Sequence, residues 1–257
     1  MHSSVGYGAD SGISPVRQDE REVAERDHEA INANGYLQTL PQKRYDDTAI
    51  MMFELVKHGH SSVRGTQMIE RMNEIHARFA IRHEDYLYML TSLMFEPARW
   101  NARFGWRQFT NIEKYANYCF WREVGKLMHL AAIPPSYEEC EQYNVDYEAS
   151  QLKRTRSAVA LAAVLFQLLE SWVPPPVRPL VKPGLSALVD DSLLACFDVP
   201  PAPGWLKWLV PAALRLRATA LRYWPRRRIE AYYIDRPLRS YKTGYRVADL
   251  GPPADWA

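Results

Sequence analysis

Apolar side chains recur at intervals of three and four residues along most of this chain. Strict alternation of apolar and polar positions, which marks a half-buried strand, is almost absent. The first long helical segment starts at Lys43 and ends at the break His58-Gly59. Because helix formers dominate the later segments as well, we predict an all-α fold with a single, mainly helical domain.

Capping residues indicate where further helices begin. Ser61-Ser62 offers an N-cap for a helix over residues 63–79. A third helix is expected over residues 84–95 and should end before Pro97, because a proline removes a backbone donor and crowds the preceding turn. Two capping-box patterns that start later helices are Thr110-Asn111-Ile112-Glu113 and Ser136-Tyr137-Glu138-Glu139.

A proline-rich stretch precedes the C-terminal region. Residues 174–183 contain five prolines, so we expect a non-helical connection along the surface there. A short helix near residues 185–197 and a longer one near residues 205–224 should follow. The predicted division is an N-terminal extension over residues 1–40, flexible apart from a short helix near residues 19–33, a helical domain over residues 41–250 with a connecting region at 171–204, and a tail at 251–257.

The distribution of charge is uneven along the 257 residues, of which 47% are hydrophobic, enough for a sizeable core. Residues 1–30 carry seven acidic and three basic side chains, whereas residues 201–257 carry eleven basic and four acidic ones. No nucleic-acid-binding motif accompanies the basic end, so we expect no nucleic-acid partner. Tryptophans beside arginines over residues 205–228 favour peripheral contact with a membrane. The more common alternative is a helix that packs on the domain with a solvated basic face.

The three cysteines, Cys119, Cys140 and Cys196, form an odd set without a CxxC pair. This pattern argues against a disulfide framework and a cysteine-rich zinc site, and it favours a reducing compartment. The N-terminus lacks the pattern of a signal peptide, and the longest apolar run, residues 158–169, is too short to span a bilayer. We expect a cytoplasmic protein that contacts a membrane only peripherally.

One histidine lies where a helix normally places a leucine. On the predicted helix over residues 63–79, His76 follows Ile69 by seven residues and Met72 by four, so it shares their apolar face. Burial disfavours the charged form of a histidine and leaves a neutral nitrogen for a metal or a hydrogen bond. From this pattern alone, a core histidine with one hydrogen bond is the more common outcome.

A second group of polar residues lies on one face of an earlier helix. Arg44, Asp47 and Thr48 occupy positions i, i+3 and i+4, so they offer donors, an acceptor and a hydroxyl to one small site. The alternative is an acidic first turn that complements the helix dipole. The spacing does not choose between these two interpretations.

Other cofactor sites have weaker support in the sequence. A di-iron bundle requires two Glu-x-x-His motifs, and only Glu25 and His28 have this spacing. The pair His58 and His60 is more typical of a helix C-terminus than of a metal site. Cys119 lacks the glycine-rich loop of a P450 thiolate ligand. The sequence contains no Gly-x-Ser-x-Gly, Walker or GxGxxG motif, which excludes the hydrolase, phosphoryl-transfer and dinucleotide-binding classes that these motifs define.

Read in order, five segments resemble the MpaB-type oxygenases, a family distantly related to the latex-clearing rubber oxygenases. The similarity extends over residues 40–150 and continues weakly through residues 187–210 and 239–246. The five segments are KRYDDT at 43–48, RMNEIHARF at 71–79, EDYLYMLTSLMFEPARWNARFGWRQFT at 84–110, EKYANYCFWREVGKLM at 113–128 and IPPSYEE at 133–139.

The resemblance implies a helical domain that binds haem b non-covalently through one histidine. The family's ligand histidine falls on His76, and its distal arginine and threonine fall on Arg44 and Thr48, with Asp47 between them. The rubber oxygenases have a lysine at the position of Asp47, so we do not expect polyisoprene cleavage. The fungal enzyme has an N-terminal membrane anchor, and the 40 residues before the first motif are not apolar enough for one.

The activity implied by the resemblance is the oxidative cleavage of a carbon–carbon double bond in an apolar, isoprenoid-like substrate by O2. Arg44 and Thr48 would donate hydrogen bonds to oxygen, and Asp47 would orient Arg44 or relay a proton. Two alternatives of other classes stay open. One is a haem-binding or sensing protein without turnover, and the other is a metal-free helical module that binds a membrane or a partner.

Overall fold

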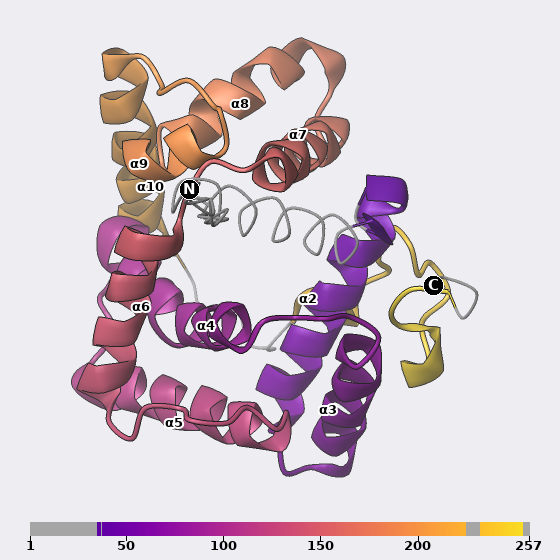
Figure 1. The fold of residues 1–257 in the computed structure, drawn as a ribbon. Coiled ribbons are helices and arrows are strands. Elements are labelled where there is room, and N and C mark those ends of the chain that lie inside the picture. The colour runs from indigo at the N-terminus through magenta and orange to yellow at the C-terminus, as the bar shows by residue number, and fades with distance from the viewer. Residues whose placement is uncertain (1–34, 37, 225–231, 254–257) are drawn as a thin grey trace, which may run out of the picture.

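The computed structural model describes residues 35–36, 38–224 and 232–253. Within these ranges the chain forms α-helices and short 3-10 helices, and no strand, which confirms the predicted all-α class. The helices, labelled in Figure 1, are α2 (Pro41–His58), α3 (Val63–His76), α4 (His83–Phe104), α5 (Asn111–Leu127), α6 (Tyr137–Gln151), α7 (Arg156–Ser171), α8 (Arg178–Ser186), α9 (Asp191–Cys196) and α10 (Gly204–Tyr223), with 3-10 helices η1 (Pro175–Val177), η2 (Tyr233–Asp235) and η3 (Val247–Asp249).

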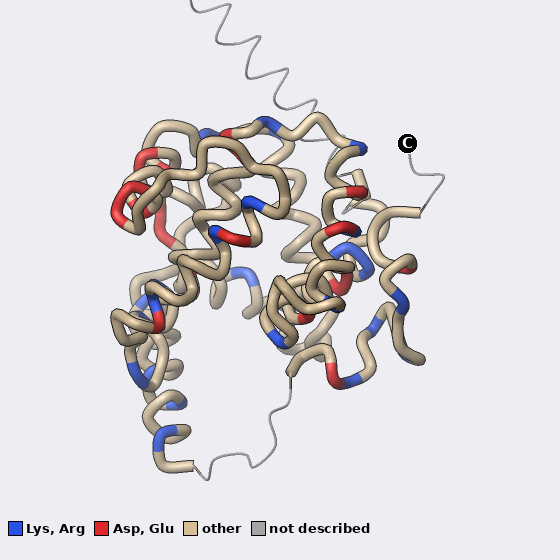
Figure 2. The backbone as a smooth tube through the Cα atoms, turned by 90° about the horizontal axis from the view of Figure 1, so that it is seen from below, with Lys and Arg blue, Asp and Glu red and all other residues tan. Residues whose placement is uncertain are grey.

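Two helices organise the arrangement. α4 packs against α5, α6 and α10, and α2 packs against α3 and α7. The C-terminal segment, residues 232–253, lies along α2 and α3 through η2 and η3 (Figure 1). α10 extends beyond the other helices at the lower left of Figure 2. The helix predicted near residues 19–33 lies outside the described residues.

The predicted helix starts agree with the structure. The Ser62 hydroxyl accepts a hydrogen bond from the Gly65 amide at 2.9 Å and so caps α3. Thr110 and Glu113 form both halves of a capping box at the start of α5. Ser136 caps α6 by accepting from the Glu139 amide at 3.2 Å. No described bond runs back from the Ser136 amide to the Glu139 carboxylate, so only the N-cap half of that prediction holds.

α3 is shorter than the 63–79 pattern predicts. It ends at His76, where the backbone changes to tighter turns: the Arg78 amide donates to the carbonyl of Ile75, and the Phe79 amide donates to that of His76. Such bonds span three residues rather than four and commonly close a helix. His76 is therefore the last residue of α3, and the chain turns away directly after it.

The prediction that a helix ends before Pro97 is wrong. α4 continues through Pro97 to Phe104. A proline at this position leaves the carbonyl of Leu93 without its usual helical donor. Asn117 of α5 replaces that donor, because its side-chain amide donates to the carbonyls of Leu93 at 3.1 Å and Met94 at 2.7 Å. A tertiary hydrogen bond thus permits the helix to continue.

The expectation of a non-helical connection at residues 174–183 is also wrong in part. α8 starts at Arg178, and Pro179 lies in its first turn, where a missing backbone donor removes no helical hydrogen bond. Pro183 lies inside the helix. The helix predicted near residues 185–197 is divided, because α8 ends at Ser186 and α9 covers only Asp191–Cys196. The predicted helix over residues 205–224 is confirmed as α10.

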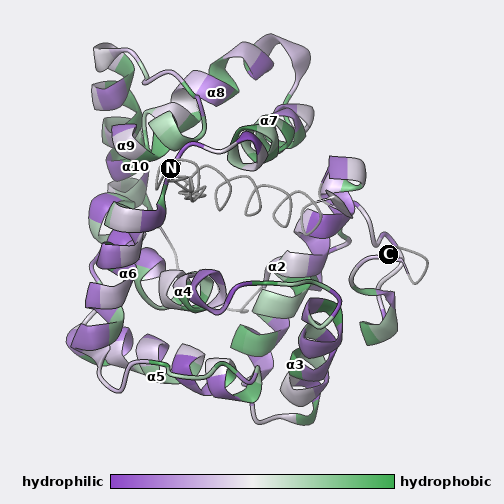
Figure 3. Ribbon diagram, viewed as in Figure 1, coloured by the Kyte–Doolittle hydropathy of each residue, from purple (hydrophilic) through white to green (hydrophobic). Residues whose placement is uncertain are grey.

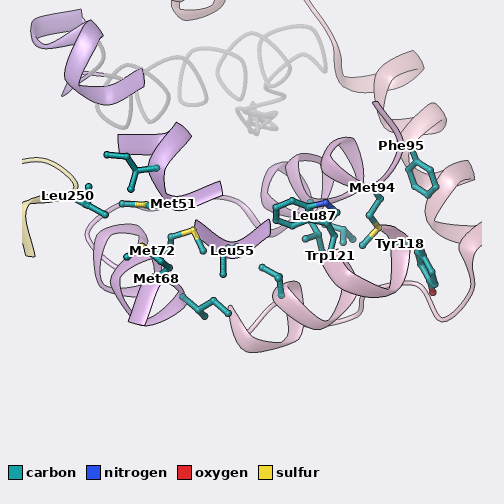
Figure 4. Close-up of a cluster of buried hydrophobic side chains, with 14 of the residues drawn as sticks. Met51, Leu55, Met68, Met72, Leu87, Met94, Phe95, Tyr118, Trp121 and Leu250 are labelled. Carbon is teal, nitrogen blue, oxygen red and sulfur yellow. The ribbon is translucent and has the colours of Figure 1, made fainter. Parts of the chain in front are cut away.

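The core lies between α2, α3, α4 and α5. α2 is hydrophilic near its start and hydrophobic near α3 and α5 (Figure 3). Figure 4 shows Leu250 of the C-terminal segment beside Met51 of α2, at the end of the cluster opposite to Tyr118 and Phe95. The labelled buried residues are Met51, Leu55, Met68, Met72, Leu87, Met94, Phe95, Tyr118, Trp121 and Leu250. The three cysteines are free thiols, as predicted. Across the described residues, none of the helices combines the length and apolar character needed to cross a bilayer.

A buried carboxylate ties the C-terminal segment to α2. Glu54 is only 4% exposed, and its Oε1 accepts hydrogen bonds from Arg64 at 2.7 Å and from the Tyr245 hydroxyl at 2.6 Å. Burial alone would raise the pKa of Glu54, but the hydrogen bonds from Arg64 and Tyr245 hold it below the ordinary value. The ionised carboxylate therefore stabilises the contact between α2, α3 and the segment after η2.

Candidate functional site

The structure contains a cavity of about 540 Å³ between the helices that carry the predicted site residues. This volume lies in the range of roughly 300–1,000 Å³ that is typical of small-molecule and cofactor sites. Most of the wall is apolar. Its apolar side chains include Met51, Met52, Met72, Ile75, Phe79, Met89, Leu90, Leu93, Trp121, Val124, Met128 and Leu130. Arg44, Asp47, Thr48 and His76 all line this cavity as well, so the fold brings together the four residues that the sequence singled out.

His76 lies at the C-terminal end of α3 with its ring at the cavity wall. Burial, and to a lesser extent the positive charge of Arg44, lower the pKa of His76 to about 4. The imidazole is therefore neutral near pH 7. Its Nδ1 is hydrogen-bonded to the Tyr86 hydroxyl, whereas no described residue forms a hydrogen bond with Nε2. One nitrogen is thus held by the protein and the other is available to a ligand.

Tyr86 is a candidate site residue that the sequence did not reveal. It comes from the first turn of α4, ten residues after His76, and the two rings meet edge-on with their centroids 5.0 Å apart. Burial raises the pKa of Tyr86, so its hydroxyl stays protonated. The turn at residues 77–82 that aims Tyr86 at His76 has no signature in the sequence.

Arg44 and Thr48 form a second polar group on the cavity wall. Arg44 donates through Nη1 to the Thr48 hydroxyl, which in turn donates to the Arg44 carbonyl at 2.9 Å. Burial lowers the pKa of Arg44, and the charge of Asp47 opposes this shift. No carboxylate among the described residues forms an ion pair with Arg44. Partial burial without an ion pair is unfavourable for a guanidinium, so its remaining N–H groups are available to a polar ligand.

Asp47 forms hydrogen bonds with the C-terminal segment. It is 1% exposed, and its Oδ2 accepts hydrogen bonds from Tyr36 at 2.7 Å, from Lys43 at 2.9 Å and from the Gly251 amide at 3.0 Å. Its Oδ1 accepts from the Tyr241 hydroxyl. No hydrogen bond joins Asp47 to Arg44 in the described part of the chain. Asp47 therefore anchors the segment that closes one side of the cavity through Gly251 and Pro252.

The donor set of the cavity fits haem b. In haem proteins the porphyrin supplies most of the ligands of the iron, so one neutral histidine nitrogen from the protein would suffice to hold the group. His76 meets this requirement, and its Nδ1 has the second partner that metal-binding histidines typically have. Among the residues described, no group of three or more His, Cys, Asp and Glu side chains is placed to hold a metal ion. His58, His60, His83 and His129 do not line the cavity.

Two other metal sites were considered from the sequence, one at Glu25 and His28 and one at His58 and His60. Glu25 and His28 lie outside the described residues. Gly59 has φ +81° at the C-terminus of α2, as expected for a helix C-cap between His58 and His60. His58 lies 3.3 Å from a Glu54 oxygen. His58 is therefore the last residue of α2 and contacts Glu54 of the same helix, and His60 follows the Gly59 cap.

Comparison with known proteins identifies related oxygenases. A family described as "ER-bound oxygenase mpaB/B'/Rubber oxygenase, catalytic domain" matches residues 21–239. The ER-bound oxygenase mpaB' of Penicillium brevicompactum is 29% identical over 202 residues, which cover 70% of this chain and 47% of that protein. The ER-bound oxygenase mpaB of Penicillium roqueforti (strain FM164) is 26% identical over 172 residues, or 59% of this chain and 56% of that protein. The chain thus spans about half the length of the curated relatives it matches.

Proposed function

Because the chain belongs to the mpaB/B' and rubber oxygenase family, we propose that it is a haem b-dependent oxygenase that uses O2 on an apolar, isoprenoid-like substrate. The family match agrees with the resemblance carried by the five sequence segments, and it supports an oxygenase activity. Haem, the substrate class and the cleavage reaction are the proposal. The observation that carries it is His76, a neutral imidazole with a free Nε2 on the wall of a largely apolar cavity.

His76 would hold the iron through Nε2, and Tyr86 would fix the ring. A neutral histidine that binds a metal through Nε2 carries its proton on Nδ1, so Nδ1 would donate to the Tyr86 oxygen. This bond selects the tautomer and the ring orientation before any ligand binds. Haem, when bound, supplies an iron centre at which dioxygen is activated.

Arg44 and Thr48 would provide the polar contacts for oxygen. The Arg44 guanidinium is already held by Thr48 and lines the cavity, and its other N–H groups form no described hydrogen bond. Donors fixed in advance in a site that excludes water stabilise developing negative charge more than water does. Asp47 would not contact oxygen itself. Its charge favours the charged form of Arg44, and its hydrogen bond with the Gly251 amide holds the C-terminal segment in place.

The proposed reaction is the cleavage of a carbon–carbon double bond. The O–O bond of one O2 and both the σ and the π bond between the two alkene carbons are broken, and each of these carbons takes one oxygen atom to form a carbonyl group. The equation balances without an external reductant. Methionine, leucine and aromatic side chains of the wall would bind the hydrocarbon chain, because they remove its apolar surface from water.

The test compares haem binding and oxygen uptake in three proteins: the wild type, His76→Ala and the control His83→Ala, which alters an exposed histidine that does not line the cavity. We expect a Soret band and a b-type pyridine haemochrome in the wild type and the control, with loss or strong alteration in His76→Ala. Oxygen uptake with a prenyl substrate should yield carbonyl products. Haem binding without oxygen uptake for any prenyl substrate would contradict the oxygenase and favour a haem-binding protein without turnover. No haem in any sample would favour the metal-free alternative.

Membrane contact and cellular location are separate proposals. The names of the two relatives call them ER-bound. We propose that this chain acts in the cytoplasm and contacts a membrane peripherally through residues 205–228, a range of which residues 225–228 lie outside the described part. The oxygenase proposal does not require this contact.

A further inference from the structure

One face of α10 packs on the protein. Leu206, Val210, Leu214 and Ala218 follow one another at intervals of four residues and are partly or fully buried. This spacing places them on one side of the helix, and α10 contacts α4 and α8. Ala218 is the only fully buried residue of the helix. α10 is therefore attached along a narrow stripe, and most of its circumference faces outward.

The opposite face is apolar and exposed. At about 100° per residue, Trp205, Leu209, Leu216 and Tyr223 fall within roughly 40° of one another on the far side of the helix. Leu216 is 72% exposed and Tyr223 is 79% exposed, and Trp208 beside them is 74% exposed. Scattered exposed apolar residues are ordinary, but a continuous stripe along five turns marks an interaction surface. Nothing in the described part of the chain covers it.

Basic residues lie on the two flanks of α10, and the helix carries no acidic residue between Gly204 and Tyr223. Lys207 pairs with Asp191 at 2.6 Å, and Arg215 donates to the carbonyl of Arg103 at 3.2 Å. Arg217 and Arg222 are exposed and form no described ion pair. In Figure 2 the basic residues are distributed along the length of α10, which protrudes from the other helices. An exposed apolar stripe on a helix with uncompensated positive charge favours a partner that offers both an apolar surface and negative charge.

We propose that α10 binds the surface of an anionic lipid membrane, with its axis in the plane of the interface. Tryptophan and tyrosine favour the boundary between head groups and acyl chains, and arginine reaches the lipid phosphates beside them. A second copy of the chain fits less well, because pairing two such faces would bring the basic residues of both together. The proposal rests on the peripheral membrane contact proposed above and specifies its helix and lipid class. It does not depend on the oxygenase reaction, because α10 does not line the cavity.

The test is flotation of the full chain with vesicles of phosphatidylcholine alone or with 30% phosphatidylserine, at about 0.1 M salt. Two variants remove the proposed contacts: Trp208→Ser with Leu216→Ser for the stripe, and Arg217→Gln with Arg222→Gln for the charge. Ile112→Ser is the apolar control, because Ile112 is 82% exposed on α5. Lys242→Gln is the charge control, because Lys242 is an exposed residue of the C-terminal segment, and this segment lies on the opposite side of Figure 1 from α10.

We expect binding to the anionic vesicles, with the partition coefficient lowered about tenfold by the stripe variant and about fivefold for each arginine removed. The two controls should bind like the wild type. Equal far-UV circular dichroism of all variants shows that the fold is kept. Absence of wild-type binding to anionic vesicles would overturn the proposal. A concentration-dependent dimer that the stripe variant abolishes, in a wild type that does not float with vesicles, would overturn it in favour of a second copy.

Discussion

Asp47→Asn distinguishes two possible roles of Asp47: anchoring of the C-terminal segment and relay of a proton in the cavity. The substitution keeps the shape of the side chain and removes its charge. In the structure the carboxylate accepts hydrogen bonds from Tyr36, Lys43, Tyr241 and the Gly251 amide. All four partners are donors, so an amide group at this position turns its NH2 toward at least one of them. One donor then loses its acceptor, and Lys43 loses its ion-pair partner.

The magnitude follows from these contacts. A hydrogen bond to a charged group contributes about 1.5–3 kcal/mol, and two such bonds are weakened or lost here. Breaking a buried ion pair at one partner costs about 3–5 kcal/mol. We therefore expect Asp47→Asn to lower the free energy of unfolding by about 4 kcal/mol. With a urea m-value of about 2–3 kcal/mol/M, the midpoint should fall by roughly 1.5 M.

The assay is equilibrium urea unfolding followed by far-UV circular dichroism, with Asp191→Asn as the control. Asp191 forms an exposed ion pair with Lys207, so its substitution should change stability by less than about 1 kcal/mol. Hydrogen exchange gives a local readout, because the Gly251 amide donates directly to Asp47 and should lose protection. A variant that stays as stable as the wild type, yet loses oxygen uptake, would refute the anchoring role and favour proton relay.

Substitutions at three other positions test the site and the core. Tyr86→Phe removes the hydroxyl that holds His76 Nδ1, so haem should still bind but with about 10–100-fold lower affinity in a haem titration; unchanged affinity would contradict the pair. Burial alone would raise the pKa of Glu54, but hydrogen bonds from an arginine and a tyrosine hold it below the ordinary value. The ionised carboxylate therefore contributes stability above pH 4.5, and this stability is lost as the pH falls through the pKa of the folded state. Glu54→Gln should therefore lower the free energy of unfolding by about 2–3 kcal/mol at pH 7 and much less at pH 3 in urea titrations; an equal loss at both pH values would contradict this. Gly125→Ala would bring a Cβ to within 2.5 Å of Leu90 Cδ2, so thermal unfolding should show a loss of about 1–3 kcal/mol, whereas a stabilised variant would show that α4 and α5 adjust freely.

The sequence alone determined the features that depend on neighbouring residues. Apolar periodicity predicted the helical class, and the caps at Ser62 and Thr110 located the starts of α3 and α5 correctly. A cap is legible because its donor and acceptor lie within three residues of each other. The apolar stripe of α3 likewise placed His76 on the inner face. The helical spacing of Arg44 and Thr48 placed both on one side of α2, and both line the cavity with His76.

Only the tertiary structure decided the features that join distant segments. Asn117 allows α4 to continue through Pro97, and the local rule for proline does not anticipate a donor from another helix. Tyr86 reaches His76 because of the turn that follows α3, and Asp47 meets Gly251 across 204 residues of chain. Local patterns record the preferences of the backbone and of single faces. Which segment packs against a given face is decided by the whole fold, because folding buries the apolar surface of all segments together.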